Sequence, residues 1–73
     1  MANIAEGFER KGKREFAHHL SISNGSNAEL RSDLYCAHDA GYINEAELAT
    51  LMEQASEVGR IIGGLYNSLT RSS

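Results

Sequence analysis

Four basic residues lie within five positions near the start of the chain: Arg10, Lys11, Lys13 and Arg14. Lysine and arginine provide the sequence-independent, salt-sensitive part of nucleic-acid affinity, so this cluster is a candidate contact for the phosphates of RNA or DNA. Glu9 and Glu15 flank the cluster and dilute its field. The alternative is a solvated corner between two helices.

The rest of the chain has the opposite charge. The formal net charge is −3, and from Asp39 onward five acidic residues face two basic ones. This balance argues against a general nucleic-acid coat, which would be basic. The sequence contains no Ser-His-Asp pattern, no glycine loop after a strand and no carboxylate pair with a pocket. We therefore expect no enzyme activity, no small-molecule substrate and no cofactor.

Three histidines and the single cysteine suggest a metal site at first sight: His18, His19, Cys36 and His38. On a helix, adjacent residues point about 100° apart and residues two apart point about 200° apart. Neither His18 with His19 nor Cys36 with His38 converges on one ion as histidines four apart would. We expect surface histidines, a packed cysteine and no metal.

The helix that carries the clearest pattern lies at the C-terminal end. Apolar residues recur three and four apart without a slip, as in a heptad seam, at Leu48, Leu51, Ala55, Val58, Ile62, Leu65 and Leu69. Asn44 and Glu47 are placed for a capping box, and Ile43 and Leu48 for a hydrophobic staple. We predict a helix over residues 44–71.

A second seam precedes it, at Phe16, Leu20, Ser23, Asn27, Leu30, Leu34 and Ala37. Gly12 is a tolerable N-cap and Gly41 a C′ glycine, which predicts a helix over residues 13–40. The residues 23–27 resemble a turn, but the heptad phase is not reset there, so we predict one continuous helix. The short link around Gly41 makes the two helices antiparallel neighbours.

Three glycines lie in the last helix, at positions 59, 63 and 64, where each costs about 1 kcal/mol relative to alanine. Gly59 and Gly63 share one face and would let another helix approach closely. The alternative is looseness near the terminus. Residues 1–11 are predicted to be the end of an earlier helix, because Ile4 and Phe8 lie four apart.

The residues from Asn3 to Arg10, Asn-Ile-Ala-Glu-Gly-Phe-Glu-Arg, resemble the signature of the bacterial four helix bundle protein family, also called the 23S rRNA-intervening sequence protein family. The resemblance continues through Leu20-Ser21-Ile22, Gly25-Ser26, Ala28-Glu29-Leu30 and Ala40-Gly41-Tyr42-Ile43. It implies an all-α, up-down four-helix bundle, often assembled into a homopentamer. The family name reflects where some of the genes lie and does not establish an activity.

Members of this family normally carry about a helix and a half before the signature. This chain starts two residues before it, and Met1 stands where a proline is common. The resemblance therefore implies an N-terminally truncated form, the C-terminal portion of the bundle. Asn24 replaces a frequent arginine and Asn27 a frequent apolar residue. A polar seam residue fixes register or oligomeric state at a cost in stability.

The motif residues of the resemblance are Asn3, Glu6, Gly7, Ser26, Glu29 and Gly41. We expect structural roles for them rather than catalysis. Glu6 would bond a neighbouring helix or subunit, and Gly7 would allow close approach or end a helix. Glu29 is the predicted buried polar contact, and a buried carboxylate needs a partner such as Arg31, Arg60 or the Asn3 amide.

The size of the chain bears on its assembly. Seventy-three residues form one domain, residues 1–73, with no disulfide to support a small core. We therefore expect a homo-oligomer. No apolar run is long enough to span a membrane, and the single cysteine without an export signal favours the cytoplasm.

Two functions follow from these patterns. The first is a non-enzymatic accessory bundle associated with RNA or DNA. It rests on the basic cluster, on the family and on relatives that accompany reverse transcriptases in diversity-generating retroelements. The second is an oligomeric protein-interaction bundle without a nucleic-acid role, which rests on the apolar seams. A truncated remnant without a function is the third alternative.

Overall fold

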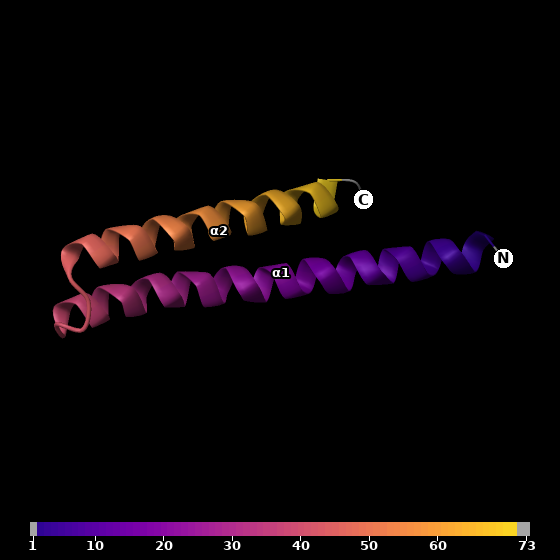
Figure 1. The fold of residues 1–73 in the computed structure, drawn as a ribbon. Coiled ribbons are helices and arrows are strands. Elements are labelled where there is room, and N and C mark those ends of the chain that lie inside the picture. Colours follow the sequence, from indigo (N-terminus) through magenta and orange to yellow (C-terminus); the bar gives the residue numbers. More distant parts are fainter. Residues whose placement is uncertain (1, 72–73) are drawn as a thin grey trace.

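A computed structural model describes the backbone of residues 2–71 and the side chains of residues 11–71. The chain forms two helices, α1 from Ala2 to Asp39 and α2 from Glu45 to Arg71. They lie side by side and antiparallel, and α1 extends well beyond the end of α2 (Figure 1). The molecule measures 59 × 15 × 13 Å. Since residues 2–71 contain no strand, the predicted all-α fold with two long antiparallel helices is confirmed.

The turn after α1 is built around Gly41. Its φ of 84° lies in the left-handed region, where a side chain would be strained. The Tyr42 amide donates to the Ala37 carbonyl at 2.9 Å, and the Gly41 amide donates to the His38 carbonyl at 3.0 Å. These two bonds form the Schellman motif that satisfies the last carbonyls of a helix. The predicted C′ role of Gly41 is confirmed.

The start of α2 is fixed by a reciprocal pair of hydrogen bonds. The Glu47 amide donates to Asn44 Oδ1 at 2.8 Å, and the Asn44 amide donates to Glu47 Oε1 at 2.9 Å. This is the predicted capping box. Ile43 and Leu48, the two staple positions, are both half-buried. The turn and the cap together force α2 to run back along α1.

The first helix differs from the prediction at Gly12. A helix ending at residue 11 and another beginning at residue 13 are not observed, because α1 is continuous from Ala2 to Asp39. Gly12 lies in open surroundings, so no packed neighbour requires a break there. One glycine costs about 1 kcal/mol but leaves the helical hydrogen bonds possible. The predicted continuity through Asn24 and Gly25 is confirmed.

The core between the helices is very small. Among the described side chains only three are buried, Leu20, Asn27 and Ala55, with exposed fractions of 6–8%. Large apolar side chains remain exposed on both helices: Phe16, Ile22, Leu30, Tyr35, Tyr42, Leu51, Val58, Ile61, Leu65 and Tyr66. Both heptad seams are therefore only partly covered by the contact between α1 and α2. No helix of the described chain is long and apolar enough to cross a membrane.

Candidate functional site

The basic cluster lies where α1 reaches the C-terminal end of α2 and continues beyond it (Figure 1). Lys11, Lys13 and Arg14 are exposed. The side chain of Arg10 lies outside the described residues. Because the helix is continuous here, the cluster is not a corner between two helices. At about 100° per residue, Lys11 and Arg14 lie about 60° apart, whereas Lys13 lies about 160° from Lys11. The cluster is thus divided between two sides of α1.

A shallow depression of about 340 Å³ gathers the residues on the side of Lys11. Its lining consists of Lys11, Arg14, Glu15, His18 and His19. The two histidine rings lie with centroids 6.2 Å apart. Among the described side chains, the one ion pair found is between His38 and Asp39, at 3.8 Å. Neither Lys11 nor Arg14 is paired with an acidic side chain of the described part.

Asn27 is the polar residue at the centre of the helix pair. Its side chain is 8% exposed, and its Nδ2 donates a hydrogen bond to the Ala55 carbonyl at 2.9 Å. Its Oδ1 is buried without a hydrogen-bond partner. A Cβ at Gly59 would stand 3.2 Å from Nδ2, so the absence of a side chain at Gly59 makes room for Asn27. The predicted close approach is thus found at Gly59, while Gly63 and Gly64 lie in open surroundings.

An apolar groove of about 580 Å³ surrounds this contact. Its lining comes from both helices: Ile22, Ser23, Ser26, Asn27, Leu30, Leu34, Leu51, Gln54, Ala55, Val58 and Ile62. Leu30 and Val58, on opposite walls, are each 49% exposed. The groove follows the two predicted seams, so the same apolar residues that join α1 to α2 also present an open face.

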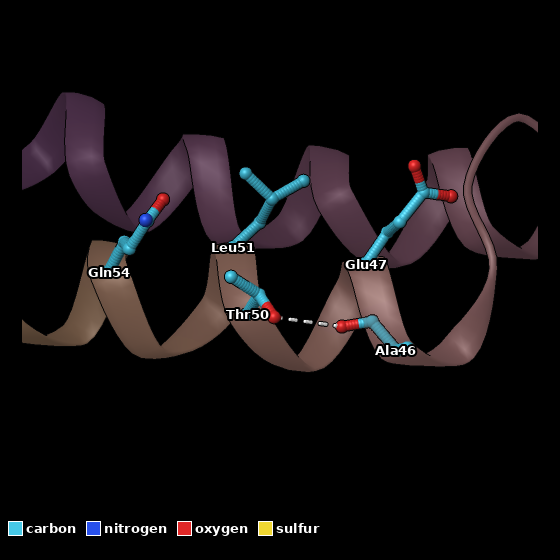
Figure 2. A pocket seen from close by; sticks show the side chains of 5 residues that line it. All are labelled: Ala46, Glu47, Thr50, Leu51 and Gln54. Atoms are coloured by element: carbon cyan, nitrogen blue, oxygen red, sulfur yellow. Dashed lines mark hydrogen bonds between the residues drawn. The ribbon is translucent and has the colours of Figure 1, made fainter.

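A smaller hollow lies on α2 near the turn (Figure 2). Its lining residues are Ala46, Glu47, Thr50, Leu51 and Gln54. The Thr50 hydroxyl donates to the Ala46 carbonyl at 3.1 Å, and Glu47 accepts the capping bond described above. Since these polar groups satisfy the backbone of their own helix, the hollow presents no arrangement of a nucleophile, a base and an orienting group.

The family model of the 23S rRNA-intervening sequence proteins matches residues 1–64, which is most of the 73-residue chain. The chain belongs to the 23S rRNA-intervening sequence protein family. No curated protein and no solved structure matches it. The resemblance carried by the segment from Asn3 to Arg10 and by the later short motifs is therefore confirmed.

The structure places some of the motif residues of this family member. The side chains of Asn3, Glu6 and Gly7 lie outside the described residues, although α1 runs through all three positions. Ser26 is exposed and lines the apolar groove. Glu29, the predicted buried polar contact, is exposed. That prediction is wrong because Asn27, two positions earlier and on the side facing α2, occupies the buried polar position.

The metal-binding residue types remain separate. Cys36 is a free, exposed thiol rather than the packed cysteine we predicted. Within the described residues, no three His, Cys, Asp or Glu side chains come together in a way that would hold an ion. His18 and His19 instead lie beside Lys11 and Arg14. Their position in this basic depression follows from helical spacing, and the sequence signal was their distance of four to eight residues from Lys11 and Arg14.

Proposed function

We propose that this protein is a non-enzymatic helical bundle that assembles from several copies and associates with RNA or DNA through the basic side of α1. The observation that carries the assembly is the uncovered apolar face. Both walls of the groove expose large aliphatic side chains, and monomeric proteins rarely expose a continuous apolar surface of this kind.

The exposed area of the chain supports assembly. Its accessible surface is 5801 Å². A compact monomer of 8.0 kDa exposes about 4,450 Å² by the scaling known for folded monomers. The excess of about 1,350 Å² exceeds the roughly 800 Å² that each partner buries in a standard interface. A homo-oligomer is the occupant we propose for the groove, and the family resemblance favours five copies.

Sedimentation over the micromolar concentration range tests the assembly. We expect an oligomer that dissociates when Leu30 is replaced by glutamate, because the charge would be buried between copies. Tyr35→Glu is the matched control, since Tyr35 is also exposed on α1 but does not line the groove. Circular dichroism at the same concentrations distinguishes dissociation from unfolding. A folded, stable monomer of the unaltered protein would refute the assembly.

The association with nucleic acid is supported by the exposed side chains of Lys11 and Arg14, which lie on one side of α1. Each phosphate contact contributes about −0.9 to the slope of log affinity against log salt. Two contacts predict about a 12-fold loss of affinity between about 50 mM and about 200 mM salt. Fluorescence anisotropy with a structured RNA and a duplex DNA measures this loss. Absence of binding at the lower salt concentration would refute the association with nucleic acid. The remaining function would be an oligomeric protein-interaction bundle.

A further inference from the structure

The outward side of α1 carries a stripe of exposed residues with little negative charge. Lys11, Arg14, His18, Ser21 and Gly25 are all exposed. At about 100° per residue, the other four lie within about 60° of His18 around the helix axis. The stripe exists because α1 does not break at Gly12. A new helix starting at residue 13 would have separated Lys11 from Arg14 and His18.

Acidic residues border this stripe rather than interrupt it. Glu15 lies about 60° from His18 and forms one edge of the shared depression. Glu29 lies on the same side, about 16 Å along the helix from His18 and about 6 Å beyond Gly25, where the stripe ends. Between Lys11 and Gly25 the stripe therefore carries the two cations Lys11 and Arg14 and the ring of His18, with the one carboxylate of Glu15 at its edge.

The stripe and most of the apolar groove lie on different sides of α1, although Ile22, which lines the groove, lies only about 40° around the helix from His18. Leu20 and Asn27, which are buried against α2, lie about 160–180° around the helix from His18. Leu30 and Leu34, which line the groove, lie about 120–160° from it. A second copy seated against Leu30 and Leu34 would leave Lys11, Arg14 and His18 facing solvent, so assembly and ligand binding are compatible.

We propose that this stripe binds the phosphodiester backbone of a nucleic acid, with Lys11, Arg14 and His18 on successive phosphates and Gly25 allowing the strand to approach the helix. This proposal rests on the nucleic-acid association proposed above and names the surface of α1 that would make the contact. Lys11 to His18 span about 10 Å along the helix. One strand of a duplex presents about three phosphates over that length.

Charge-removing variants of the full chain test the surface, with an RNA duplex, a DNA duplex and a single strand as separate probes. Each phosphate contact is worth about eightfold in affinity at about 100 mM salt by the slope given above. We expect this loss for Lys11→Gln and for Arg14→Gln, each with a salt slope shallower by about 0.9. Lys13→Gln is the matched control and removes the same charge from another side of α1, with less than about a twofold loss.

Two further variants test the carboxylate at the edge of the stripe, Glu15, and the histidine within it, His18. Glu15→Gln should raise affinity severalfold. His18→Ala should weaken binding severalfold, because the ring N–H no longer donates to a phosphate of the strand. Circular dichroism verifies that each variant is helical, and the preferred probe identifies the source of the phosphates.

The outcomes separate the two proposals. If the unaltered protein binds none of the probes at low salt, the nucleic-acid association itself is refuted, and the surface with it. If it binds but Lys13→Gln is as damaging as Arg14→Gln, only the surface is refuted. Binding that His18→Ala leaves unchanged would also refute the surface.

Discussion

Replacement of Asn27 by leucine provides the most direct test of the helix contact. Leucine has the same branched shape as asparagine, but it removes the buried Oδ1 that has no partner. Removal of this buried, unpaired oxygen stabilises the folded state by about 1–3 kcal/mol. Two newly buried methyl groups add about 1.6 kcal/mol. These terms favour the variant.

Two terms oppose it. The hydrogen bond from Nδ2 to the Ala55 carbonyl, 2.9 Å long, is worth about 1 kcal/mol. The space beside Gly59 is tight, since a Cβ there would stand 3.2 Å from Nδ2, and overpacking costs about 1 kcal/mol or more. We expect Asn27→Leu to raise the free energy of unfolding by about 1–2 kcal/mol.

Urea denaturation followed by circular dichroism measures this change, at one fixed protein concentration because assembly shifts apparent stability. Asn24→Leu is the matched control. It makes the same substitution on an exposed position of α1 and should change stability by no more than about 0.5 kcal/mol. A loss of more than about 1 kcal/mol for Asn27→Leu would refute the reasoning. It would show that Oδ1 receives a hydrogen bond in the assembled protein.

Three further changes test the backbone of the hairpin. Gly12→Ala should stabilise the protein by up to about 1 kcal/mol in the same urea assay, since Gly12 lies inside a continuous helix; destabilisation would indicate a cap or a break. Gly41→Ala should lower the unfolding free energy by about 1–2 kcal/mol because its φ is 84°, and Gly41→Asn should lose less; equal losses would contradict the left-handed geometry. Asn44→Ala should cost about 1 kcal/mol and Asn44→Asp little, as measured by thermal denaturation; no loss for alanine would argue against the capping box.

Much of the hairpin was predictable from local signals. The capping box of Asn44 with Glu47 and the left-handed Gly41 involve residues close in the chain, so their chemistry is readable without a fold. The family was also accessible, because its signature near Asn3 is a run of consecutive residues. The boundary at Gly12 was predicted wrongly because a glycine is compatible with both a cap and a helix interior. Only the surroundings of a glycine decide between them.

The sequence by itself determined that two amphipathic helices must turn back on each other, because heptad spacing and cap residues act over one or two turns. The tertiary structure decided which polar residue is buried. Asn27 rather than Glu29 faces α2, where Gly59 leaves room for its amide. It also decided that α1 runs unbroken through Gly12, which places Lys11 on the same side as Arg14 and His18. The first outcome depends on the rotation of α1 and on its register against α2, which local spacing alone does not fix. The second depends on the surroundings of Gly12.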